Sequence, residues 1–253
     1  MLGHATVELL GVRLAAVDLD TAVERVAGLV ARPAFGHVVT ANVDFLAQTG
    51  RDPELLAILS RADLVVADGV PLLWMAKWQD TPLPGRVNGT DLVVRLLAEA
   101  GQQGWPVYFL GGEPGVAEAA AAASTDRYGV VVAGAAGPGP GEMADPVRSR
   151  AIALAVGSSN AALLLLAIGG GRQEHWIDRH RDELGGCVAI GVGSAVDFVA
   201  GTRPRAPRWM QRAGLEWAFR LAVEPRRLWR RYLVEDPVVL VRFARSHWGN
   251  RHG

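Results

Sequence analysis

The chain has 253 residues, half of them hydrophobic, and its 26 basic side chains balance 26 acidic ones. This is enough to bury a substantial core, and the length suits one α/β domain with an appendage. The single cysteine, Cys187, excludes an internal disulfide framework. The longest uncharged apolar run, residues 161–168, is shorter than the roughly 20 residues that span a bilayer. The N-terminal residues show no secretory signal, so we expect a soluble or peripheral protein of a reducing compartment.

The neutral average hides a strong asymmetry of charge. Residues 203–253 hold 12 arginines and four acidic residues, while the preceding part of the chain carries the opposite net charge. A basic segment on an acidic body indicates an anionic partner, such as membrane headgroups, phosphate groups or nucleic acid. We therefore predict a catalytic α/β domain over residues 1–202 and a basic helical appendage over residues 203–253.

Short apolar runs alternate with helical patterns along the chain. The predicted elements are a strand or hairpin over 7–17, a helix over 18–30, a strand over 37–42, a helix over 44–61, a strand over 64–69, a helix over 71–78, a helix from 90 or 91 to 103, a strand over 107–112, a helix from 116, a strand over 130–135, a loop over 137–142, a helix over 145–157, a strand over 162–171, a helix over 173–184 and a strand over 187–193. Apolar strands that alternate with helices predict a mainly parallel, Rossmann-like sheet with helices on both faces.

Polar and glycine residues follow four of these strands. In such sheets, ligands bind beyond the carboxyl ends of the strands. We therefore expect one rim to gather Thr40 and Asn42, residues 67–69, residues 111–115 and residues 169–174.

Asp68 is the candidate base of this rim. It follows the apolar run 64–67 and precedes Gly69. A carboxylate at the end of a buried strand can be desolvated, which raises its pKa and makes it a better base near neutral pH. An aspartate that only caps the helix starting near Pro71 fits the same position.

Two glycine-rich turns are candidates for binding phosphate. Gly111 and Gly112 end a strand and precede a helix, so backbone N–H groups there could bind a phosphate, although a plain turn fits equally well. Their spacing does not match GxGxxG, which weakens the interpretation as a nicotinamide-dependent oxidoreductase. In the second turn, Arg172 and Gln173 could reach a diphosphate or a sugar, or could simply form a solvated first helical turn.

The appendage interleaves arginine with tryptophan. On a helix Arg227, Arg230 and Arg231 would share a face, which Arg220 could join. This composition is typical of a membrane interface, where tryptophan rings lie at headgroup level and cations pair with lipid phosphates. An ordinary amphipathic helical pair has the same periodicity.

The sequence does not support a metal site. It contains no HExxH, P-loop or GxSxG pattern, and no Asp-x-Asp pair follows an apolar strand. We expect neither a metal nor a cofactor.

Taken together in order, several motifs resemble the WecG/TagA/CpsF proteins, glycosyltransferase family 26. The matching residues are 40–42, 67–71, 86–91, 110–112, 171–176, 191–193 with Asp197, 205–207, 214–217, 220–221 and 224–227. The resemblance extends from about Val7 to Leu233. The sequence departs from the family at Gly171-Arg172, where members usually have proline and lysine; the positive charge is kept at Arg172.

This resemblance implies metal-independent, inverting transfer from a UDP-sugar to an undecaprenyl-diphosphate-linked sugar at the inner face of the bacterial cell membrane. It implies that Asp68 is the base, and that appendage arginines close over the site. The residues implied to line the sugar and diphosphate pocket are Thr40, Asn42, Arg86 and Gln173, with Asp197 near the uridine, and the arginines implied to close over it are Arg220, Arg227 and Arg230. From their positions at the strand ends, Gly111, Gly112, Arg172 and Glu174 are further candidates for binding the substrate.

The identity of the transferred sugar is open within this resemblance. N-acetylmannosamine is our prediction, while glucose, glucuronic acid and N-acetylmannosaminuronic acid fit the same pattern. The expected partners are the donor, the lipid-linked acceptor and an anionic membrane surface, with self-association into a homo-oligomer left open. Nucleic acid is not expected, because the tail contains no groove-reading module. The alternatives are an NAD-linked oxidoreductase and a non-catalytic peripheral membrane protein.

Overall fold

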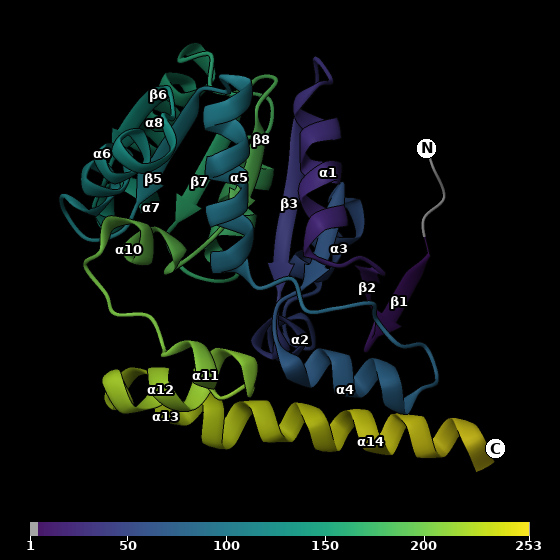
Figure 1. The fold of residues 1–253 in the computed structure, drawn as a ribbon. Helices are drawn as coiled ribbons and strands as arrows, with labels where there is room; N and C mark the ends of the chain where they lie inside the picture. The colour runs from purple at the N-terminus through teal and green to yellow at the C-terminus, as the bar shows by residue number, and fades with distance from the viewer. Residues whose placement is uncertain (1–4, 253) are drawn as a thin grey trace.

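The computed structural model describes residues 5–252, and for Arg212, Arg227 and residues 247–252 it describes the backbone alone. A six-stranded sheet in the order β4-β3-β8-β7-β5-β6 forms its centre (Figure 1). The strands are β3 (Gly36–Ala41), β4 (Leu64–Ala67), β5 (Val107–Gly111), β6 (Val132–Ala136), β7 (Leu163–Ala167) and β8 (Val188–Gly191). Every neighbouring pair is parallel. The predicted fold class is thereby confirmed.

Alternate residues of each strand pack against helices on opposite faces of this sheet. In β3, for example, Val38 belongs to one core cluster and Val39 to another. The helices of the first face are α1 (Leu19–Val30), α5 (Gly89–Gln103), α6 (Val116–Tyr128) and α10 (Ala195–Ala200). Those of the other clusters are α2 (Val43–Thr49), α3 (Pro53–Arg61), α4 (Val70–Trp78), α8 (Pro146–Ser158) and α9 (Arg172–Arg179). Because both faces are covered, the central strands are largely apolar.

The N-terminal segment is a hairpin of β1 (Thr6–Leu9) and β2 (Val12–Ala15), which pair antiparallel. Leu10 and Gly11 form its turn with φ of 51° and 86°, the positive values that a two-residue hairpin turn requires.

The element boundaries differ from the prediction at three places. The helix expected over 44–61 is two helices, because the Asp52 side chain accepts a hydrogen bond from the backbone of Leu55 (3.0 Å) and Pro53 occupies the first turn of α3. The expected loop at 137–142 contains the start of a short helix, α7 (Pro140–Ala144). The helix expected over 173–184 already ends at Arg179.

The C-terminal part of the chain is helical and lies at the carboxyl ends of the strands. It comprises α11 (Arg208–Arg212), α12 (Glu216–Val223), α13 (Pro225–Arg230), the π-helical turn η1 (Arg231–Glu235) and α14 (Asp236–His252). Figure 1 shows α14 as a long helix that runs beneath α2 and α4. Its Val239 and Phe243 are buried in the same core cluster as Leu72 and Met75 of α4. None of the helices in the described residues is long and apolar enough to cross a membrane.

The stability of the sheet can be tested at Phe109, which is fully buried in β5. Phe109→Ala should lower the free energy of unfolding by about 3–5 kcal/mol, because a large cavity replaces the ring. Urea denaturation measures this change. The control Val147→Ala removes a side chain that is 78% exposed on α8, and it should change the same quantity by no more than about 0.5 kcal/mol.

Candidate active site

Two cavities lie at the carboxyl edge of the sheet. The larger, of about 900 Å³, lies among the loops that follow β5 to β8, and we call it the loop cavity. The smaller, of about 290 Å³, lies between the ends of β3 and β4 and the C-terminal helices, and we call it the appendage cavity. Both are within, or close to, the size range of small-molecule sites. A third hollow shares Ser194 and Arg203 with the loop cavity and Arg220 with the appendage cavity.

Asp68 lies in the wall of the appendage cavity, at the end of β4. Its backbone N–H donates to Ala41 of β3 (2.7 Å), which fixes the start of the turn. The alternative role as a helix cap does not hold, because the residue at the N-cap of α4 is Gly69, without a side-chain cap. The carboxylate instead accepts a hydrogen bond from the side-chain nitrogen of Asn88 (3.2 Å). It is therefore oriented from the loop that precedes α5.

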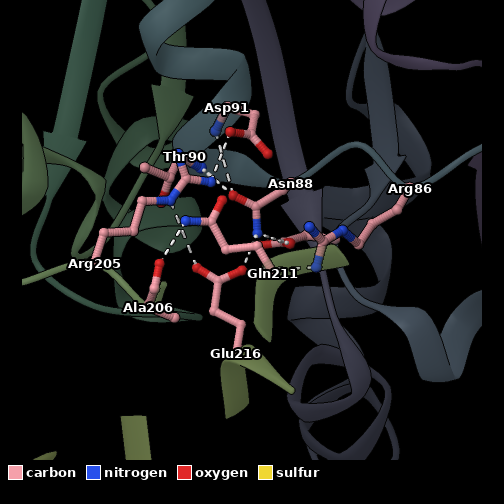
Figure 2. A network of polar contacts seen from close by, with 9 residues as sticks. Arg86, Asn88, Thr90, Asp91, Arg205, Ala206, Gln211 and Glu216 are labelled. Atoms are coloured by element: carbon pink, nitrogen blue, oxygen red, sulfur yellow. Dashed lines mark hydrogen bonds and ion pairs between the residues drawn. The ribbon is translucent and has the colours of Figure 1, made fainter. Parts of the chain in front are cut away.

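Asn88 connects Asp68 to the C-terminal helices, and Figure 2 shows its place beside Glu216. Its Nδ2 donates both to Asp68 and to Glu216 of α12 (3.3 Å), while its Oδ1 accepts from the backbone of Thr90 (3.0 Å) and caps α5. Arg86 lies 3.6 Å from the same Glu216 carboxylate. Glu216 is thus buried among groups of the body, although it belongs to the appendage.

Burial raises the pKa of Asp68 above its ordinary value, and the nearby carboxylate of Glu216 adds to this effect. The positive charges of Arg220 and Arg86 and the Gly89 backbone amide oppose it. The base candidate therefore has a raised pKa and two arginines beside it.

The appendage arginines differ in position. Arg220 lines the appendage cavity and lies over the Phe198 ring, 5.4 Å from its centroid. Arg230 is 74% exposed, is paired with Glu235 (3.3 Å) and lines neither of the two cavities. The side chain of Arg227 lies outside what the structure describes. Of the three arginines predicted from the appendage, the structure thus brings Arg220 to Asp68.

The wall of the loop cavity contains basic side chains. Arg172, Arg179 and Arg203 line it, together with Gly112 and Asp197. The Asp197 carboxylate, at the start of α10, lies 3.1 Å from Nε of Arg203. Glu113 and Glu142 line the cavity as well, so its wall carries both arginines and carboxylates.

The glycines after β5 are required by close backbone packing. A Cβ on Gly111 would lie 2.7 Å from the Ala167 carbonyl oxygen, and both Gly111 and Gly112 have positive φ. The N–H of Gly112 donates to that carbonyl (2.8 Å). This amide is therefore engaged with β7, and the wall of the loop cavity at this point is backbone.

Several predicted binding residues lie beneath the cavity walls. Gln173 and Glu174 are buried and bonded to each other, with Nε2 of Gln173 donating to Oε1 of Glu174 (3.0 Å). Thr40 is also buried, and its hydroxyl donates to the Gly191 carbonyl (3.2 Å). Asn42 lines the appendage cavity and caps α2. Direct ligand contacts of the three buried residues stay predictions.

The appendage cavity is also lined by residues to which the sequence assigned no role. Asn88 and Glu216 belong to the family motifs at 86–91 and 214–217. The motifs therefore pointed to these two residues, but the sequence did not predict that they contact each other. Trp74, Tyr232 and Asp236 line the cavity as well. Burial raises the pKa of Asp236 to about 6, against the effect of Arg231.

Among the residues described, no group of three or more His, Cys, Asp or Glu side chains is arranged to hold a metal ion. The cations that the site offers an anion are arginines.

The buried Glu174 makes a testable contribution to stability. Burial raises its pKa from 4.5 to about 7. The folded state therefore holds a proton that the unfolded state releases above pH 4.5, so the free energy of unfolding should fall as the pH rises from 4.5 to 7. The slope is at most about 1.4 kcal/mol per pH unit.

Urea denaturation at several pH values in this interval measures the effect. Glu174→Gln should remove this part of the pH dependence, whereas Glu118→Gln, at an exposed position of α6, should keep it. An unchanged slope in Glu174→Gln would mean that Glu174 is ionised in the folded protein.

The sequence profile of the glycosyl transferase WecG/TagA/CpsF family matches residues 7–253. A protein of Bacillus spizizenii named N-acetylglucosaminyldiphosphoundecaprenol N-acetyl-beta-D-mannosaminyltransferase is 33% identical over 197 residues, which are 78% of this chain and 74% of the relative. The chain therefore belongs to the WecG/TagA/CpsF family of glycosyl transferases.

Proposed function

We propose that the chain transfers N-acetylmannosamine from a UDP-linked donor to an undecaprenyl-diphosphate-linked N-acetylglucosamine. The sugar and the acceptor follow the name of the Bacillus spizizenii relative. The observation that carries the proposal is the carboxylate of Asp68, which faces a cavity beside Arg86 and Arg220. Glycosyl transfer from a nucleotide diphosphate needs a base for the acceptor hydroxyl and cations for the departing diphosphate.

In this mechanism Asp68 takes the proton from the acceptor hydroxyl. The oxygen attacks the anomeric carbon from the face opposite the diphosphate, and the carbon–oxygen bond to the diphosphate breaks with its electron pair on UDP. The configuration at the anomeric carbon is thereby inverted. The raised pKa of Asp68 supports this role, because a stronger base is better matched to a hydroxyl near neutral pH.

The departing UDP gains negative charge, and arginines are the groups that would stabilise it. Arg86 comes from the body and Arg220 from α12, and both line the appendage cavity. Because they stand in place before the reaction, they stabilise the charge without reorganising. The mechanism needs no metal.

We assign the donor nucleotide and the acceptor to different cavities. The loop cavity, with Arg172, Arg179 and Arg203, suits the nucleotide. A small hollow shares Arg203 with the loop cavity and Arg220 with the appendage cavity, so the donor sugar would lie on this side of the base. The acceptor would enter through the appendage cavity, where Arg86 and Arg220 lie within reach of the donor diphosphate.

A protein that uses a lipid-linked acceptor has to meet a membrane. We place this activity at the inner face of the cell membrane, with the basic appendage as the contacting part. Its excess of arginine over acidic residues favours anionic lipids.

The central test is Asp68→Asn. This variant keeps the size of the side chain but cannot accept the proton, so transfer should fall by about 10²–10⁴-fold. Transfer from UDP-N-acetylmannosamine to a short-chain lipid-diphosphate N-acetylglucosamine measures the loss, with EDTA present in one arm. The control Asp126→Asn, at an exposed position of α6, should keep the wild-type rate. Full activity of a folded Asp68→Asn protein refutes the base.

A second test concerns Glu216, whose negative charge helps to raise the pKa of Asp68. Glu216→Gln should move the acidic limb of the pH profile of kcat/KM to lower pH, because this limb reports the base of the free enzyme. Glu235→Gln, another appendage carboxylate, should leave the limb where it is, since Glu235 pairs with Arg230. A limb that moves equally in both variants contradicts the assignment.

A further inference from the structure

The appendage cavity is lined by charged and apolar residues together, and the exposed Trp74 lies at its mouth. Asp68, Arg86 and Arg220 are among the charged residues, while Trp74 of α4 and Pro237 and Leu240 of α14 are apolar. A ligand that fits such a cavity has a charged head and a hydrocarbon chain. The hydrocarbon chain of such a ligand would continue along the exposed surfaces of α4 and α14.

Helix α4 is apolar on the side that faces solvent. Leu72, Met75 and Ala76 are fully buried, yet Trp74 and Trp78 are 58% and 59% exposed. These two positions are four apart and thus lie on one face of the helix, away from the buried residues. An amphipathic surface helix would have polar residues there.

Helix α14 and the preceding turn repeat this pattern. Val239 and Phe243 are buried against the core, whereas Leu233, Val234, Val238 and Val241 are exposed. At 100° per residue, positions 238 and 241 of α14 lie on one face, opposite positions 239 and 243. The helix is therefore apolar on its exposed face as well as on its buried one.

Basic residues accompany both exposed faces. Lys77 lies beside Trp78 on α4, and Arg242 and Arg245 follow Val241 on α14. All three are exposed. Tryptophan and aliphatic side chains with neighbouring cations are the composition that binds an anionic lipid surface, where long basic side chains reach the phosphates.

We propose that Trp74 and Trp78 of the body, together with Leu233, Val234, Val238 and Val241, form a single lipid-inserting surface around the mouth of the appendage cavity. The occupant is an anionic bilayer. The membrane contact is thus shared between α4 and the appendage, and the lipid chain of an acceptor enters at Trp74 without leaving the hydrocarbon layer. The inference rests on the proposed lipid-linked acceptor.

Two variants and a matched control test this surface. Co-sedimentation with vesicles of phosphatidylglycerol and phosphatidylcholine measures partitioning, without donor or acceptor. Trp74→Ala/Trp78→Ala should reduce the partition coefficient by about tenfold or more, the loss expected when the burial of large apolar side chains is removed. Trp209→Ala should leave it unchanged, because Trp209 is 64% exposed on α11 outside this surface. Circular dichroism checks that each variant is folded.

Quenching by bromine-labelled lipid provides a second measurement. The wild-type fluorescence should be quenched, and Trp74→Phe/Trp78→Phe, which keeps an apolar ring, should bind vesicles but lose most of the quenchable emission. Equal partitioning of the alanine variant and the wild type overturns the proposal. So does an alanine variant that binds vesicles normally but no longer self-associates in sedimentation velocity, since a second copy of the chain then covers the surface.

These results are independent of the transfer assay. Loss of vesicle binding in the alanine variant stands even if Asp68→Asn keeps its activity, and in that case the proposed reaction fails while the lipid surface remains. Normal vesicle binding together with an inactive Asp68→Asn leaves the reaction in place and removes the surface alone.

Discussion

The side-chain amide of Asn88 holds the body and the C-terminal helices together around one carboxylate. Its two amide hydrogens go to Asp68 and Glu216, and its oxygen accepts from two backbone amides at the start of α5. The hydrogen-bonding capacity of the group is thereby used completely. Since Asn88 is buried, an unpaired amide would cost about 1–3 kcal/mol, so the position of α12 and the orientation of Asp68 depend on each other.

This link also brings groups with opposing effects on the pKa of Asp68 close to its carboxylate. Burial and Glu216 favour the neutral form of Asp68, while Arg86 and Arg220 favour the ionised form. Two of these four influences, Glu216 and Arg220, come from α12. Movement of that helix would therefore change both the basicity of Asp68 and the cations available to a leaving group. The proposed site is therefore complete only when the appendage is docked.

The sequence was sufficient for the parts of this protein that local patterns determine. Apolar strands alternating with helices predicted the parallel sheet, and the strand-end rule placed Asp68 at the correct edge. The contact between Asn88 and Glu216 joins residues 128 apart, which no local pattern encodes. The burial of Gln173 and Glu174 likewise depends on the rotation of α9 beneath Gly191, where a Cβ would lie 2.3 Å from the Glu174 carboxylate. Arg230 has the right spacing for the site, yet it faces solvent.

The π-helical turn η1 accounts for the way in which one helical segment serves both the cavity and the surface. Arg231 and Tyr232 at its start line the appendage cavity, while Val239 and Phe243 of α14 are buried against the core. A π turn adds a residue to the helical repeat and so rotates everything after it by about 100° relative to a regular helix. In a regular helix without the π turn, the exposed valines of α14 would point in a different direction relative to Arg231. The irregular turn thus sets the angle between the residues that face the reaction and those that face away from the body.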